Sequence, residues 1–391
     1  MNAHLRRPLP GSESRLTPRE SGFSGDHVGA ALFHLYLHLA GLAPDDAAEC
    51  IESALNAAAD AAAGSDMRLS LYEGILGYAW MVEHLSRVAP VGDSELSAEL
   101  DEAVRAALDD DIPDDLITGA VGFGMYALER RENAPEASEA IVSRVIATLG
   151  RQARPVDGGI TWPAHRNSLP SNARDEAGTV SLVSLAHGVP GIVAFLARAH
   201  AEGANEDAAR LAEGALAWLQ TQRHAEPSPA WFDHVIGPGS AAFRGPSRLA
   251  WCYGDLSAAM AFGLAGAVFE RHDWMETSAR IARAAAARER NASGVHDAGL
   301  CHGAAGVAHL LHTLWILTGD DSLCDAAIRW YGTTLDIADT DAGFRSFWPG
   351  DDAWREDRSF LTGSSGVGLA LLSAISPVPP LWSRLLLTSL S

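Results

Sequence analysis

Apolar and polar positions follow two helical patterns along this chain. In the first, alanine-rich segments place apolar residues on one face and charged residues on the other, as in residues 45–63, 95–108, 206–222 and 274–290. This spacing predicts amphipathic helices with one face in the core. In the second, a Gly-x-x-Gly motif opens a run of small and apolar residues that has no polar face. Helices that are apolar on every side must be buried.

The Gly-x-x-Gly motif is an internal repeat. Complete copies begin at Gly74, Gly119, Gly188, Gly303 and Gly363, and an incomplete copy is Gly254-Asp-Leu-Ser257. Successive first glycines lie 45 to 69 residues apart, a length that suits one helical pair per unit. We therefore predict an all-α fold, an α/α toroid in which six outer helices wrap six inner ones. Glycine permits close approach of the backbone, so the inner helices are expected to begin together at one end.

Two stretches interrupt the helical pattern, at about 151–185 and 226–247. Both are rich in proline and glycine, and the first ends in the β-prone residues 179–183, so we predict loops with short strands. Each stretch comes shortly before a Gly-x-x-Gly motif, so both are expected near the crowded end, where a substrate groove would form. Residues 1–24 are expected to be a flexible arm, and residues 25–391 a single domain.

Composition narrows the function classes. The chain has 391 residues, an apolar fraction of 47% and a formal net charge of −21. Such acidity argues against nucleic-acid binding, which needs a basic face. The most apolar stretches, 28–43 and 258–269, are shorter than the roughly 18–20 residues of a spanning helix, and no secretory signal is evident. We expect a cytoplasmic protein without a transmembrane segment.

Chemically versatile residues collect at the motif starts. Cys252 precedes the fourth motif and Cys301-His302 precedes the fifth. Catalytic zinc takes three protein ligands and keeps one position open, so two thiols and an imidazole at neighbouring helix starts form a candidate zinc site. The spacing alone leaves a second interpretation open, that of buried inert cysteines.

Four other residues of metal-binding type receive a structural interpretation. Cys50 and Cys324 fall in amphipathic segments and are interpreted as buried small apolar residues. His309 and His312 follow His302 along one helix and are interpreted as packing or surface residues.

Three short segments each open a glycine-repeat helix: Trp251-Cys-Tyr-Gly254, Cys301-His-Gly303 and Ala186-His-Gly188. These segments resemble the lanthionine synthetase C (LanC) family of lanthipeptide cyclases, and the resemblance covers about residues 28–375. It implies an α/α toroid with one Zn²⁺ per chain. It also implies an enzyme that adds peptide cysteine thiols to dehydroalanine or dehydrobutyrine, closing lanthionine and methyllanthionine rings. The expected partner is a dehydrated precursor peptide, with a separate dehydratase as a further candidate partner.

The resemblance also implies roles for individual residues. Cys252, Cys301 and His302 match the family's zinc ligands, and His187 matches a histidine regarded as an acid or base.

Three more residues match active-site positions of the family. They are Arg248, Tyr253 and Asp115, with Asp114 as an alternative register for the aspartate. Arg248 could stabilise an enolate and His187 could protonate the α-carbon, with a carboxylate such as Asp115 holding the imidazole. The chain departs from the family at Ser257, where many members have glycine.

Other functions stay open from sequence alone. An α/α-toroid glycosidase would need two carboxylic acids, for which Asp114, Asp115 and Asp255 are available, but it would leave the paired thiols unexplained. A protein like the eukaryotic LanC-like proteins, which bind glutathione, would share the metal ligands. So would a non-catalytic zinc toroid that serves as a scaffold.

Overall fold

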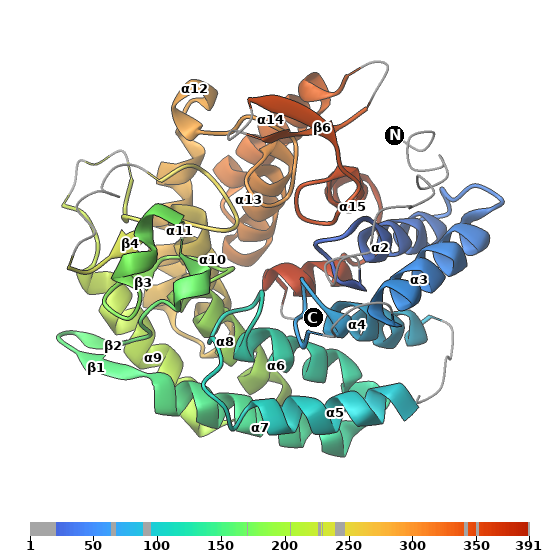
Figure 1. Ribbon diagram of the computed structural model, residues 1–391. Helices are drawn as coiled ribbons and strands as arrows, with labels where there is room; N and C mark the ends of the chain where they lie inside the picture. Colours follow the sequence, from blue (N-terminus) through green and yellow to red (C-terminus); the bar gives the residue numbers. More distant parts are fainter. Residues whose placement is uncertain are drawn as a thin grey trace.

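Helices in two concentric rings make up most of the molecule (Figure 1). The structure is a computed structural model. It describes residues 21–63, 68–88, 95–169, 171–203, 205–225, 228, 230–238, 247–339, 343–348 and 352–389. Residues 1–20 of the predicted arm lie outside this set. Ser21 and Phe23 belong to the core, where the Phe23 ring lies 5.6 Å from that of Trp80, so the arm does not extend to residue 24.

Seven helices form the inner ring in the described part of the chain. They are α2 (Asp26–Leu39), α4 (Ile75–Ser86), α6 (Ala120–Glu129), α8 (Val189–Gly203), α10 (Asp255–Val268), α13 (Ala304–Thr318) and α15 (Ser364–Ile375). Each contacts the next, and α15 contacts α2, so the ring is closed. The predicted all-α toroid is confirmed. The predicted number of inner helices was one too small, because the Gly-x-x-Gly before α2, Gly22 to Gly25, ends at the N-cap of the helix instead of placing its second glycine in the first turn.

Six amphipathic helices lie outside this ring. They are α3 (Ala47–Ala63), α5 (Glu95–Ala107), α7 (Pro135–Gln152), α9 (Glu206–Thr221), α11 (His272–Ala286) and α14 (Asp321–Ile337). Each follows one inner helix along the chain, and only α15 is not followed by an outer helix among the described residues. No described helix is long and apolar enough to cross a membrane.

Short elements connect the helices. They are η2 (Arg130–Glu132), η3 (Arg166–Ser168), η4 (Ser171–Glu176), α12 (Arg290–Ser293) and the antiparallel pairs β1 (Arg154–Val156) with β2 (Gly159–Thr161), β3 (Ser181–Leu182) with β4 (Val235–Ile236), and β5 (Arg345–Trp348) with β6 (Ala353–Glu356). The β3–β4 pair joins the two stretches in which short strands were predicted.

The second glycine of each complete motif packs against the turn that precedes its helix. A Cβ at any of these glycines would lie 2.5 Å or less from the carbonyl oxygen six residues earlier, which the turn brings over the first turn of the helix. The positions are Gly77, Gly122, Gly191, Gly306 and Gly366. A side chain would therefore displace backbone, which explains the glycine repeat.

Backbone hydrogen bonds connect these turns to one another. The amide of Trp251 donates to the carbonyl of Cys301 at 2.9 Å, and the amide of Cys301 donates to that of Leu361 at 2.8 Å. Equivalent bonds join Tyr72 to Ile117 at 3.4 Å and Leu116 to Ala186 at 3.1 Å. The inner helices therefore begin together at one end of the toroid, as predicted.

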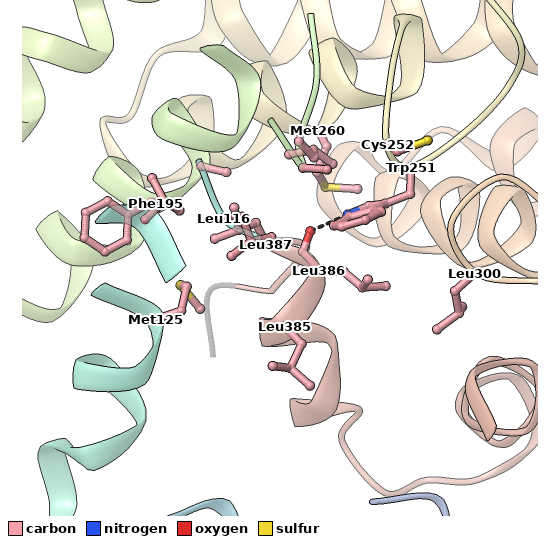
Figure 2. Packing of buried hydrophobic residues seen from close by; sticks show 14 of the residues in the cluster. Leu116, Met125, Phe195, Trp251, Cys252, Met260, Leu300, Leu385, Leu386 and Leu387 are labelled. Carbon is pink, nitrogen blue, oxygen red and sulfur yellow. Dashed lines mark hydrogen bonds between the residues drawn. The ribbon is translucent and has the colours of Figure 1, made fainter. Parts of the chain in front are cut away.

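The C-terminal segment fills the centre of the ring (Figure 1). It contains η6 (Leu381–Leu386), and its residues from Trp382 to Thr388 are buried. In Figure 2, Leu385, Leu386 and Leu387 lie among side chains of the inner helices and their turns. The chain therefore fills the centre of the ring with residues 382–388, which we call the C-terminal plug. This plug follows α15 in place of a seventh outer helix.

Candidate metal centre and active site

Two neighbouring turns bring together the cysteines and the histidine. Cys252 lies in the turn before α10, and Cys301 and His302 lie in the turn before α13. The amides of Trp251 and Cys252 both donate to the carbonyl of Cys301, at 2.9 and 3.3 Å. Candidate ligand atoms of Cys252, Cys301 and His302 consequently lie within 4.8 Å of one another. Cys252 is 4% exposed, whereas Cys301 and His302 are partly exposed, so the group has an accessible side.

The donor set fits zinc. His302 Nδ1 is buried and has no hydrogen-bond partner among the described residues, so this polar atom is left unsatisfied by protein groups. The adjacent Cys301 thiol holds the pKa of Cys252 well below its ordinary value, against the effect of burial, with help from His302 and Arg248. The same neighbour and burial raise the pKa of Cys301 well above its ordinary value. One thiolate, a second thiol and an imidazole suit zinc with one position open.

His187 forms an ion pair with Asp115. Its Nδ1 lies 2.7 Å from Asp115 Oδ2, and the side chains are 23% and 1% exposed. Burial alone would lower the pKa of His187, but the Asp115 carboxylate outweighs it and the pKa is raised. Burial would raise the pKa of Asp115, but the charge and hydrogen bond of His187 lower it, with help from Ser168.

Asp114 lies beside this pair, but the carboxylate that binds the His187 ring belongs to Asp115. Burial and the charge of Asp115 raise the pKa of Asp114 to about 7. Of the two aspartates, Asp115 is therefore the one that holds the His187 ring.

Arg248 and Tyr253 complete the group of residues proposed from sequence. Arg248 Nη2 lies 3.8 Å from Cys252 Sγ, and its side chain is exposed. The rings of Tyr253 and His187 are 6.3 Å apart. Burial raises the pKa of Tyr253, with further contributions from the cysteines, so its hydroxyl stays protonated.

A serine connects the histidine's turn with the cysteine's turn. The Ser184 hydroxyl donates to the carbonyl of Cys252 and accepts from the amide of His187, the latter at 2.8 Å. All seven predicted side chains thus meet at one end of the toroid.

Sequence reasoning missed two residues from the insertions. Ser168 Oγ donates to Asp115 Oδ2 at 2.7 Å, and the Ser168 carbonyl accepts from the Tyr253 hydroxyl at 3.3 Å. The ring of His234 lies 5.9 Å from that of Tyr253, and burial lowers its pKa. Neither residue belongs to a repeated motif, so no signal in a single sequence marked them.

Glu73 is a third missed residue, and the repeat could have found it. Its charge contributes to the raised pKa of His187. It directly precedes the first glycine of its motif, and the residues at this position are partly exposed in every repeat: Glu73, Thr118, His187, Tyr253, His302 and Thr362. The residue before the first glycine is therefore the repeated position that faces the open end.

The cysteines and histidines that were set aside have other surroundings. Cys50 and Cys324 are partly exposed, which corrects the expectation that they are buried. Neither belongs to a metal-binding group of three among the described residues. His309 is buried with its ring 4.7 Å from that of Trp382, and His312 lies 3.4 Å from the Tyr331 hydroxyl, so both pack as interpreted.

Asp255 has a structural environment. Its carboxylate accepts hydrogen bonds from the amides of Trp231 and Phe232 at 3.1 Å and pairs with Arg288. These bonds connect Asp255 to the second insertion and to the segment between α11 and α12.

Comparisons with known proteins identify a family and a common fold. A family model described as lanthionine synthetase C-like protein matches residues 26–387. Among solved structures, nisin cyclase matches with a TM-score of 0.72 and 19% identity over 99% of this chain and 94% of that chain, which shows a common fold. An unsaturated glucuronyl hydrolase from Bacillus sp. GL1 reaches a TM-score of 0.48 at 15% identity, over 77% of this chain and 85% of that chain. A comparison with curated proteins found no match.

Proposed function

Because the chain belongs to the lanthionine synthetase C-like family, we propose that it is a zinc-dependent lanthipeptide cyclase. It would add cysteine thiols of a peptide to dehydroalanine or dehydrobutyrine and so form lanthionine and methyllanthionine rings. The observation that carries this proposal is the group of Cys252, Cys301 and His302, whose ligand atoms lie within 4.8 Å of one another.

The residues of the group would hold one zinc ion per chain. Zinc bound there would lower the pKa of a substrate thiol, so that the thiolate exists near neutral pH. The substrate sulfur then bonds to the β-carbon, and the electron pair of the carbon–carbon double bond moves toward the α-carbon and its carbonyl oxygen. A proton added to the α-carbon completes the thioether, and the proton lost by the thiol balances it.

His187 and Arg248 provide the charges that this reaction needs. Asp115 binds His187 Nδ1, which leaves Nε2 as the ring nitrogen for proton transfer. The raised pKa keeps the imidazole protonated further toward neutral pH, which suits a general acid. The Arg248 guanidinium, 3.8 Å from Cys252 Sγ, would stabilise the negative charge that develops on the enolate oxygen.

The substrate we propose is a peptide already dehydrated by a separate dehydratase, and the place of reaction is the cytoplasm. Cytosolic reductants keep thiols free, which both the peptide cysteines and the free Cys252 and Cys301 require.

Metal analysis combined with a cyclisation assay tests the proposal. Protein purified without chelators should carry one zinc per chain, and Cys252→Ala and Cys301→Ala should lose it. Cys50→Ala and Cys324→Ala are matched controls and should keep it. A dehydrated precursor peptide should lose its free thiols faster with the wild type than without protein, as measured by alkylation and mass. Metal-free wild type would contradict the zinc site. Zinc-loaded protein that leaves the peptide at the background rate would indicate a scaffold, and one that binds only glutathione would indicate a LanC-like binding protein.

A further inference from the structure

The turn that carries Cys252 differs from the other motif turns. Gly254 has a φ of 93°, a left-handed conformation that favours glycine. The first glycines of four other motifs are extended, with φ from −164° to −97°: Gly74, Gly119, Gly303 and Gly363. In this repeat Ser257 stands where the others have the second glycine. The fourth turn therefore cannot pack on its helix as the others do.

Ser257 replaces close packing with a hydrogen bond. Its buried hydroxyl donates to the carbonyl of Trp251 at 2.7 Å, and Trp251 is six residues earlier, the residue that a second glycine would touch. The serine thus binds the residue directly before Cys252. This bond is specific to the fourth repeat, because the complete motifs have no side chain at that position.

Trp251 has two more hydrogen bonds to different parts of the molecule. Its amide donates to the carbonyl of Cys301 at 2.9 Å. Its indole Nε1 donates to the carbonyl of Leu386 at 2.7 Å, shown by the dashed line in Figure 2. Trp251 is 1% exposed, so bulk water does not compete for these hydrogen bonds. The residue before Cys252 is therefore connected to α10, to the turn of the other two ligands and to the C-terminal segment.

The C-terminal segment is itself held firmly at this point. The carbonyl of Leu385, next to that of Leu386, accepts from the Tyr72 hydroxyl at 2.6 Å, and the Tyr72 ring lies 6.3 Å from that of Trp251. One residue before Leu385, Arg384 pairs with the buried Glu129 at 3.0 Å. The Leu386 carbonyl is consequently a fixed acceptor for the indole.

We propose that Ser257 and the C-terminal segment act through Trp251 as positioning residues, which place Cys252 relative to Cys301 and His302. The proposal rests on the zinc site of the proposed function. Metal ligands that lose an outer hydrogen-bond partner typically lose about 10- to 100-fold in metal affinity. The alternative is that these bonds stabilise the core alone and leave the metal site unchanged.

Two substitutions separate these explanations. Trp251→Phe removes the indole N–H and keeps an aromatic ring, and Ser257→Ala removes the hydroxyl and keeps Cβ. Each has a control with the same bond elsewhere. Trp162 Nε1 donates to the Leu149 carbonyl at 2.9 Å, and the Ser278 hydroxyl donates to the Ala259 carbonyl at 2.7 Å; both side chains are buried. The controls are therefore Trp162→Phe and Ser278→Ala.

The measurements are zinc release to a chromogenic chelator and the absorption bands of the Co²⁺-substituted protein. We expect Trp251→Phe and Ser257→Ala to bind zinc about 10- to 100-fold more weakly than wild type, so that they release it faster to the chelator, and to shift the cobalt bands. The controls should match wild type in both measurements, even where their thermal unfolding temperatures fall equally. Ser257→Ala is the milder change and serves if Trp251→Phe does not fold.

Several results would overturn the proposal. Unchanged release rates and cobalt bands in Trp251→Phe and Ser257→Ala would show that these bonds do not position Cys252. Equally fast release from the controls would show general loosening instead of positioning. Wild type that binds no zinc would refute the proposed function itself, whereas zinc-loaded wild type with unaffected variants refutes only this inference.

Discussion

The charge state of His187 depends on the hydrogen-bond donors that surround the Asp115 carboxylate. Asp115 Oδ1 accepts from the amide of Thr118 at 2.8 Å, and Oδ2 accepts from Ser168 at 2.7 Å and pairs with His187. Hydrogen bonds to the ionised form stabilise a carboxylate, so Asp115 stays charged although it is buried. A fixed negative charge beside the imidazole in turn favours the imidazolium. The charge of His187, the proposed proton carrier, is thus set by Asp115 and by the groups that donate to it.

Substitution of the two histidines should separate proton transfer from metal binding. His187→Asn should keep zinc and slow ring closure by about 10²–10⁴, the usual effect of losing a general acid or base. His302→Asn should lose zinc and activity together, because it removes a proposed ligand. Zinc content and thiol loss from the dehydrated peptide are measured on the same preparations.

The contrast between the two variants protects the test against simple misfolding. A His187→Asn protein without zinc, or one that cyclises at the wild-type rate, would show that His187 is not the proton carrier. Retained zinc in His302→Asn would remove His302 from the ligand set.

At the scale of helices and turns, the glycine repeat explains why much of the fold was predictable. The five complete motifs and the incomplete copy at Gly254 mark turns that fold over helix starts, so their spacing located six inner helices and the end where the site lies. Residues at equivalent positions, such as His187 and His302, were recognisable for that reason. The helix α2 was missed because its Gly-x-x-Gly, Gly22 to Gly25, ends at the N-cap instead of opening the apolar run, and Ser168 was missed because its contact with Asp115 depends on an irregular insertion.

Replacing glycine with alanine should have opposite effects on the free energy of unfolding in a turn and in an outer helix. A Cβ at Gly366 would clash with the carbonyl oxygen of Phe360, so Gly366→Ala should lower the free energy of unfolding by about 1–3 kcal/mol. Gly332 is exposed in α14 with nothing within 4 Å of a Cβ, so Gly332→Ala should raise it by about 0.5–1 kcal/mol. Urea unfolding measures both. Equal effects of the two substitutions would mean that the turn does not need its glycine.

At the scale of the whole molecule, the C-terminal segment connects the two ends of the toroid. One end carries the proposed site. Toward the other end, buried Glu129 accepts from His84 Nδ1 at 2.9 Å and pairs with Arg87 and Arg384. Within the segment, the Arg384 side chain belongs to this ion network, and the Leu386 carbonyl accepts the hydrogen bond from Trp251 Nε1. Sequence patterns did not predict this path, because a short apolar 3₁₀ segment has no periodicity that distinguishes a plug from a surface turn.

Removing the charge of Glu129 should destabilise the whole ring in a manner that depends on pH. Burial would raise the pKa of Glu129, but His84, Arg384 and Arg87 lower it far below its ordinary value. A carboxylate whose pKa is lower in the folded than in the unfolded protein contributes its full stabilisation when the pH is above the unfolded-state pKa of about 4.3. This stabilisation is lost as the pH falls from there toward the folded-state pKa. Glu129→Gln should therefore cost about 3–5 kcal/mol of unfolding free energy at pH 7, because it removes the buried counter-charge of Arg384 and one of the two carboxylates that pair with Arg87.

The matched control for this prediction is Glu213→Gln. Glu213 pairs with Arg271 at 3.2 Å on the surface, where its side chain is 65% exposed, so its loss should change stability little at any pH. Urea unfolding of wild type and both variants at pH 7 and near pH 4 provides the comparison. The difference in unfolding free energy between wild type and Glu129→Gln should be smaller at the lower pH, because wild type then begins to lose the contribution of the ionised carboxylate. If the gap is the same at both pH values, or no larger than that of Glu213→Gln, then the ion network does not hold the C-terminal plug in place.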